Sequence, residues 1–101
     1  MIIDVTKTLN GLDGEPLKDE DMKPVILRTS AINAMMVQMD SDSNMTGEQK
    51  LTNWVLAQRL QKEDKPDLTP EEISSIKERI GKAFGPAVVG PAFTILNGSP
   101  E

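Results

Sequence analysis

Residues 67–86 read DLTPEEISSIKERIGKAFGP, and this stretch gives the clearest structural signal in the chain. Thr69 can cap a helix whose first residue is Pro70, because proline suits the first helical position. Two glutamates follow at the positive end of the helix dipole. Apolar residues then recur at helical spacing up to Gly85-Pro86: Ile73, Ile76, Ile80, Ala83 and Phe84. The stretch predicts an amphipathic helix whose apolar stripe needs partners elsewhere in the chain.

A second helix is predicted upstream, from Thr46 to about Lys62. Thr46 and Gln49 form a capping box, in which each side chain bonds the other residue's backbone N–H. The apolar residues of this helix cover a wide arc. One stripe holds Leu51, Trp54 and Val55, and a neighbouring stripe holds Leu56 and Leu60. A helix with two apolar stripes is expected to pack on two sides.

Two further helices complete the predicted helical region, 29–98. Thr29 or Ser30 can cap a short helix with apolar residues at i, i+3, i+4 and i+7: Ile32, Met35, Met36 and Met39. The last segment keeps helical spacing beyond residue 86, although Pro91 is expected to kink or interrupt it. Asn97-Gly98 is expected to close it.

The N-terminal region, 1–28, favours β-structure. Residues 2–9 (IIDVTKTL) alternate imperfectly between apolar and polar, which is typical of a half-buried strand. Turn residues follow at 10–14, and a second apolar run lies at 25–27. We see no internal repeat. The predicted fold class is therefore α+β, in which an N-terminal β-hairpin or small meander packs on three to four short α-helices within a single domain, 1–101.

Composition removes several classes of function. The 101-residue chain has no cysteine and no histidine, so disulfides, thiolate nucleophiles, common zinc ligands and the usual neutral-pH base are excluded. A formal charge of −5 disfavours nucleic-acid binding through a basic face. No apolar run approaches the roughly 20 residues of a membrane span, and no basic, apolar leader is visible. We expect a cytoplasmic protein that binds neither nucleic acid nor membrane.

Residues 40–51 (DSDSNMTGEQKL) raise the question of a calcium site. Asp40, Asp42 and Asn44 supply oxygens at the first, third and fifth positions of a calcium-binding loop. The sixth position is Met45 in place of glycine, and the twelfth is Leu51 in place of a bidentate glutamate. A polar connector is therefore favoured, with these three residues as weak metal candidates, and we expect no cofactor.

Two groups of residues are candidates for binding a protein partner. Met35, Met36 and Met39 lie close together, and methionine is common both in cores and at adaptable binding surfaces. Trp54 has the same two interpretations, as a buried anchor or as an interface hot spot. The second group is the acidic tip of the N-terminal region, which comprises Asp19, Glu20 and Asp21.

The chain resembles a group of small proteins, of roughly this length, encoded by tailed bacteriophages and prophages. The segments that carry the resemblance are 9–35 (LNGLDGEPLKDEDMKPVILRTSAINAM) and 67–98 (DLTPEEISSIKERIGKAFGPAVVGPAFTILNG). The sequence departs from the pattern at Met22, where such proteins tend to have glycine, and at Pro91, where a helix-forming residue is expected. The resemblance brings no catalytic motif, and it implies a phage accessory protein with particle assembly as one setting.

Three hypotheses for function follow. The first is a non-enzymatic phage or prophage protein in the host cell that binds a phage structural protein, as an assembly factor or chaperone of virion (tail) components. The alternative is a regulator or inhibitor that binds a host enzyme through its acidic surface. An enzyme using carboxylates or Lys82 is disfavoured, because no catalytic constellation stands out. A homo-oligomer is a further expectation, since a small sheet leaves open edges.

Overall fold

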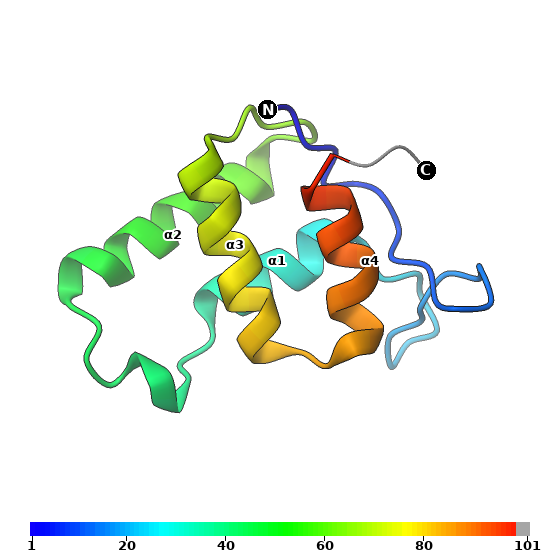
Figure 1. Cartoon of the computed structure of the whole chain (residues 1–101), viewed down its shortest axis with the longest axis horizontal. Coiled ribbons are helices and arrows are strands. Elements are labelled where there is room, and N and C mark those ends of the chain that lie inside the picture. The colour runs from blue at the N-terminus through cyan, green and yellow to red at the C-terminus, as the bar shows by residue number, and fades with distance from the viewer. Residues whose placement is uncertain (99–101) are drawn as a thin grey trace.

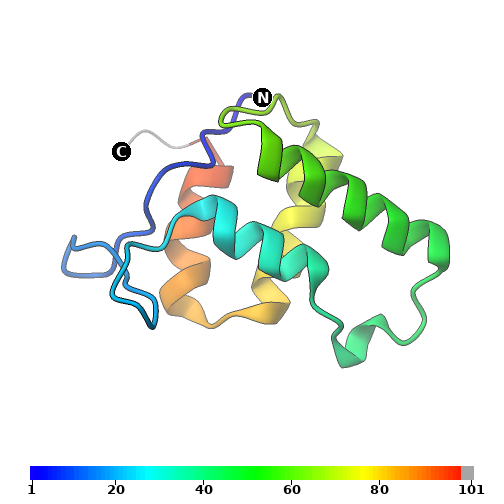
Figure 2. The same ribbon diagram turned by 180° about the vertical axis from the view of Figure 1, so that it is seen from behind.

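Four α-helices form the structure. The computed structural model describes residues 1–98, with α1 at Leu27–Met36, α2 at Gly47–Lys62, α3 at Pro70–Ala83 and α4 at Pro86–Leu96. A short 3-10 helix, η1 (Asp40–Asp42), lies in the α1–α2 connection. In Figure 1, α3 and α4 lie in front of α1, and α2 runs along one edge. Figure 2 shows the opposite side, where α1 and α2 form the nearer layer.

The predicted α+β class is wrong, because residues 1–98 form no strand or sheet. The extended N-terminal region makes isolated antiparallel bridges instead: Ile2–Asp67, Thr8–Ile26, Asn10–Pro16 and Lys18–Pro24. Pro16 and Pro24 each occupy a position of their bridge that needs no N–H, because the flanking residues make the hydrogen bonds: Leu17 to Leu9 in the first bridge and Val25 to Leu17 in the second. The fold is mainly α, and the open sheet edge expected to drive self-association is absent from the described residues.

Three apolar residues, eight apart in sequence, hold the N-terminal region together. The N–H of Leu9 donates to the carbonyl of Val25, that of Val25 to Leu17, and that of Leu17 to Leu9, each at 2.8 Å. The three extended segments therefore close a ring of backbone hydrogen bonds. Leu9 is fully buried, and Leu17 and Val25 pack against the core. In this ring the N–H and C=O groups of all three residues are hydrogen-bonded, as the paired strands of a hairpin would also have achieved.

The two loops between these residues repeat the same geometry. In the first, the N–H of Gly11 donates to the carbonyl of Glu15 at 2.8 Å. In the second, the N–H of Asp19 donates to the carbonyl of Lys23 at 2.9 Å. The chain thus contains an eight-residue structural repeat. The sequence carries it as two copies of L-x-x-x-D-x-x-P, at 9–16 (LNGLDGEP) and 17–24 (LKDEDMKP), a repeat that we did not recognise from the sequence alone.

The predicted starts of α2 and α3 are confirmed. Thr46 and Gln49 cap α2 reciprocally, and Thr69 and Glu72 cap α3 in the same way. The hydroxyl oxygens accept from the Gln49 and Glu72 N–H groups at 3.1 Å in each case. Both starts were readable because a capping box is local to four residues.

The start of α1 differs from the prediction. The helix begins at Leu27, ahead of Thr29 and Ser30, and its N-cap residue Ile26 makes no side-chain cap. The N–H groups of Leu27 and Arg28 donate to the carbonyls of Lys7 and Val5, at 2.9 and 2.8 Å. Backbone from a distant segment thus satisfies two of the free N–H donors at the start of this helix, in place of a capping side chain.

Buried apolar side chains from all four helices and the N-terminal segment form one core. They comprise Ile3, Val5, Leu9, Leu27, Ala31, Ala34, Met35, Leu56, Ala57, Leu60, Leu68, Ile73, Ile76, Ile80, Ala92, Ile95 and Leu96. The predicted stripe of α3 is buried at its three isoleucines. In α1 the buried face instead centres on Ala31, Ala34 and Met35, so Ile32 and Met36 lie at its margin.

α4 continues through Pro91, which it contains as an internal residue. The hydroxyl of Thr94 donates to the carbonyl of Gly90 at 2.9 Å. Gly98 has a positive φ of 75°, and its N–H donates to the carbonyl of Ile95 at 2.9 Å. The predicted end of this helix at Asn97-Gly98 is therefore confirmed, because glycine adopts this left-handed conformation without steric cost.

Candidate protein-binding surface

α2 carries apolar residues on two faces, and the described chain covers one of them. Leu56, Ala57 and Leu60 are buried. Leu51, Trp54 and Val55 remain 54%, 49% and 47% exposed. The helix was expected to pack on two sides, but within residues 1–98 only its inner side is packed. The second stripe is left at the surface as a candidate interface.

We define the α2 outer face as Leu51, Trp54, Val55, Gln58 and Lys62. Their i, i+3, i+4, i+7 and i+11 spacing places them on one side of a helix with 3.6 residues per turn. This side points away from the buried Leu56–Leu60 side. The face is therefore apolar in its N-terminal part and polar and cationic at its C-terminal end.

Shallow grooves flank this face. The groove toward α1 has a volume of about 320 Å³, and Ile32, Met36 and Trp54 supply much of its apolar lining. The groove toward α3 is about 370 Å³ and is lined in part by Leu51 and Val55. The side chains of a partner helix can pack into such grooves on either side of a ridge.

The predicted methionine cluster is divided by the structure. Met35 is 3% exposed and belongs to the core, whereas Met36 is 48% exposed and shares a groove with Trp54. Met39 lies beyond α1 and is partly buried in the connection to α2. One methionine of the three thus joins Trp54 in a surface, and a continuous methionine face is not formed.

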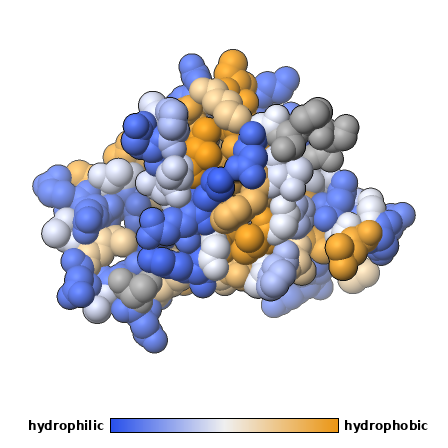
Figure 3. Space-filling model, in the orientation of Figure 1, coloured by the Kyte–Doolittle hydropathy of each residue, from blue (hydrophilic) through white to orange (hydrophobic). Residues whose placement is uncertain are grey.

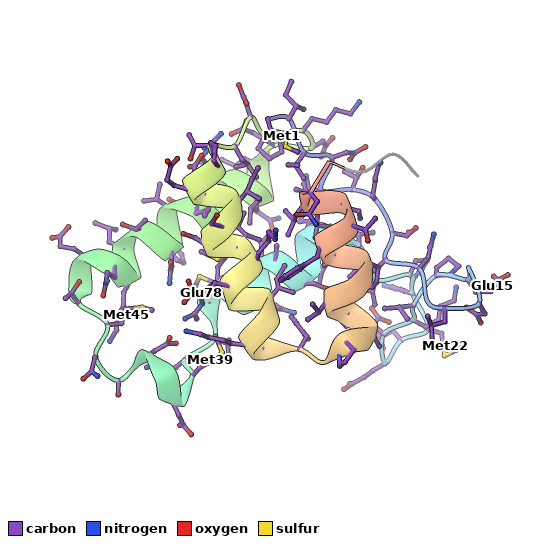
Figure 4. All side chains as sticks on the ribbon, in the orientation of Figure 1. Met1, Glu15, Met22, Met39, Met45 and Glu78 are labelled. Atoms are coloured by element: carbon purple, nitrogen blue, oxygen red, sulfur yellow. The ribbon has the colours of Figure 1, made fainter. Side chains whose placement is uncertain are left out.

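The acidic tip lies far from this surface. Figure 4 places Met22, which follows Asp21, beside Glu15 at one end of the molecule, and Met39 and Met45 toward the other. The longest dimension of the molecule is 40 Å. The Asp19 carboxylate accepts from two backbone N–H groups of its own loop, both at 2.9 Å. The two predicted partner-binding groups are therefore separate surfaces.

The weak metal candidates lie in and beside η1. Asp42 is 4% exposed, and its carboxylate accepts from the Met39 N–H at 2.8 Å and from Arg79 Nη1 at 2.6 Å. The Met39 N–H, followed by Arg79, lowers the pKa of the Asp42 carboxyl. Asp40 and Asn44 are exposed. Across residues 1–98, no cluster of carboxylates suited to a metal ion occurs.

Arg79 is a buried residue whose role the sequence did not reveal. It lies on the apolar side of α3 and is 6% exposed. Besides Asp42, its guanidinium donates to the carbonyls of Ala34 at 2.9 Å and Val37 at 2.6 Å. These bonds fix the end of α1 and the following connection onto α3. Its donors are directed to protein acceptors, so we interpret the cluster as structural.

A hollow of about 860 Å³ lies between the N-terminal loops and α4. The helix contributes mainly small and apolar residues to it, including Pro86, Ala87 and Gly90. Leu12 stands exposed at its rim. In the view of Figure 3, apolar atoms reach the surface in separate patches between hydrophilic ones. Exposed apolar side chains are thus not confined to α2, but the only tryptophan lies there.

Comparison with known proteins adds no relative. The chain matches no protein-family model, no curated protein and no solved structure. No described helix has the length and apolar character needed to cross a membrane. The resemblance to phage accessory proteins stays a prediction from the sequence.

Proposed function

We propose that this chain is a non-enzymatic protein-binding domain that acts through the α2 outer face. The observation that carries the proposal is the half-exposed Trp54, flanked by Leu51 and Val55 on a helix whose opposite side is fully packed. Tryptophan is strongly enriched among the residues that dominate binding energy. An exposed apolar group rimmed by polar residues is typical of protein interaction sites.

Burial of these side chains by a partner would release a useful free energy. Each is about half exposed, so full burial would gain on the order of 1 kcal/mol per residue from the apolar area alone. Tryptophan adds a large rigid surface at low entropic cost. The gain is concentrated within one turn of α2, which suits a helical or extended segment of a partner.

The setting that we propose is the assembly of a phage particle, most specifically its tail, in the host cytoplasm. This part rests on the resemblance of segments 9–35 and 67–98 to small phage and prophage proteins. In that setting the domain would hold a virion component as an assembly factor or chaperone. The partner would be a phage structural protein.

The test compares two leucines. Tagged protein is used to capture virion proteins from phage-infected or prophage-induced cells, and identified partners are then purified and titrated. Leu51→Ala on the α2 outer face should weaken binding by about tenfold. Leu12→Ala, at the more exposed and distant loop, should leave binding unchanged. If no virion protein binds, or if both variants bind equally well, the proposal fails.

A second candidate function uses the acidic tip, as in the inhibitor alternative. Its support is that Glu20 and Asp21 are exposed and directly precede Met22, which Figure 4 places at the end of the molecule away from Met45. Acids in such a position can meet a basic groove of a host enzyme. Glu20→Gln combined with Asp21→Asn should then abolish enzyme binding and reduce its salt dependence, whereas Leu51→Ala should not.

A further inference from the structure

We infer that the α2 outer face binds a second copy of this chain, in an antiparallel two-fold arrangement. The inference rests on the proposed function, in that it takes this face to bind protein, and it adds a second copy of the chain as a partner. Self-association was first expected through open sheet edges, which residues 1–98 do not contain, and is now inferred through α2. Its basis is the order of charged and apolar residues along α2, which places opposite charges together when two copies of the helix run antiparallel.

The pattern is symmetric about Val55. Glu48 precedes Val55 by seven residues, and Lys62 follows it by seven. Seven residues are close to two helical turns, so all three side chains lie on one side of α2, about 10 Å apart along its axis. Leu51 and Gln58 lie between them on the same side. An acid, an apolar middle and a base therefore follow one another along the helix.

This order favours an antiparallel partner helix. A two-fold axis beside Val55 would place Glu48 of each copy near Lys62 of the other, with the leucine, tryptophan and valine side chains in the middle. A parallel pair would bring like charges together at both ends. Self-complementarity of this kind is what an interface with two-fold symmetry requires.

Both terminal charges are available for such pairing. Glu48 and Lys62 are exposed, and neither takes part in an ion pair among residues 1–98. α2 contains one acid and three bases, in a chain with a net charge of −5. The acidic excess that repels two copies therefore lies outside the proposed contact.

The purified chain alone tests the inference, by sedimentation and by fluorescence. Trp54 is the only tryptophan and there is no tyrosine, so intrinsic emission reports directly on the face. We expect a monomer–dimer equilibrium across micromolar concentrations. The emission should shift to shorter wavelength as the dimer forms and Trp54 leaves water. A chain that stays monomeric at all concentrations would overturn the inference.

Charge reversal tests the orientation. Glu48→Lys alone and Lys62→Glu alone should each raise the dimer dissociation constant by about tenfold. The double variant restores both pairs and should return the constant to near the wild-type value. Lys18→Glu is the matched control, because Lys18 is exposed, lies in the N-terminal loops and takes part in no ion pair among residues 1–98, and it should have no effect. Single reversals without effect, or a double variant that is no better than either, would contradict antiparallel pairing.

Cross-linking tests the position of the axis. The chain has no cysteine, so Val55→Cys introduces a single thiol beside the proposed two-fold axis. Mild oxidation should link two copies through this position. Ser74→Cys, on the exposed side of α3, should remain unlinked. Equal linking of both variants, or none at position 55, would overturn the proposed contact.

The two proposals can fail separately. A monomeric wild-type chain whose virion partner is lost in Leu51→Ala would refute self-association and retain the proposed function. A dimer that responds to charge reversal but binds no virion protein would retain self-association and refute the proposed function.

Discussion

Met22 occupies a backbone conformation that usually belongs to glycine. Its φ is +63°, and Gly14, eight residues earlier in the equivalent loop, has a φ of +81°. A side chain in the left-handed region is unfavourable by roughly 1–2 kcal/mol. The Met22 side chain is 73% exposed and so recovers little by packing. The positive φ is therefore a physical reason to expect glycine at this position.

We therefore expect Met22→Gly to stabilise the fold by about 0.5 kcal/mol, because relief of strain exceeds the greater chain entropy of glycine. Gly14→Ala should destabilise it by about 1 kcal/mol for the converse reason. Urea unfolding followed by circular dichroism measures both. A loss of stability in Met22→Gly would show that the methionine side chain makes a favourable contact.

Arg79 and Arg59 allow the effect of burial on stability to be separated from the effect of the number of hydrogen-bonding partners. Each guanidinium contacts three protein partners, but the Arg79 side chain is 8% exposed and that of Arg59 is 33% exposed. Arg79→Ala removes the cation that pairs with the buried Asp42 carboxylate and the donor to two carbonyls, and should lower Tm by about 10 °C or more. Arg59→Ala should lower it by much less. Similar losses in thermal unfolding would refute a special role for burial.

At the scale of elements, the helix N-termini are stabilised in two ways, by capping side chains or by tertiary contacts. α2 and α3 have threonine caps, whereas α1 starts against the carbonyls of Val5 and Lys7. A local signal can be read from four residues, but a donor satisfied by a segment some twenty residues away cannot. This is why two helix starts were predicted correctly and the third was not.

Thr46→Ala and Thr69→Ala should each destabilise the fold by about 1 kcal/mol, the usual effect of losing an N-cap. Thr52→Ala is the control, because Thr52 lies inside α2, where its exposed hydroxyl donates to the Glu48 carbonyl. It should be neutral or slightly stabilising, since alanine favours helix. Chemical unfolding of the three variants provides the comparison. Equal losses in all three would contradict the capping explanation.

At the scale of the whole molecule, two ionised carboxylates connect distant parts of the chain, since Asp42 pairs with Arg79 and Glu72 with Arg59. Hydrogen bonds lower the pKa of Asp4, mainly from the Thr6 side chain, and of Asp42, mainly from the Met39 N–H. The Thr69 N–H does the same for Glu72. Folding thus favours the ionised form of each group.

A lowered pKa in the folded state means that the stabilisation is present above the ordinary carboxyl pKa of about 4. It is lost as pH falls through the folded values. Tm should therefore be highest near neutral pH and fall steeply below pH 4, and Asp42→Asn should flatten that fall while lowering Tm at pH 7. Thermal unfolding between pH 7 and 2 measures both effects. Stability that rises on acidification would contradict this account.

The whole molecule also decides which apolar residues are available. The sequence placed Met35, Met36, Met39 and Trp54 in one group of candidates, and the structure buries Met35, separates Met39 and leaves Met36 beside Trp54. Helical spacing gives relative directions around a helix axis. It does not say which direction faces the core, because that depends on where the other helices lie.

The sequence by itself determined the helical region, the capped starts of α2 and α3, and the two apolar stripes of α2, since all of these are local patterns. It predicted a hairpin at residues 1–28 because local propensity reports extended backbone and not its pairing. Tertiary structure alone decided that this backbone closes into a ring, that Arg79 is buried against Asp42, and that one stripe of α2 stays exposed. Each depends on contacts between segments distant in sequence, whose free energy no short stretch contains.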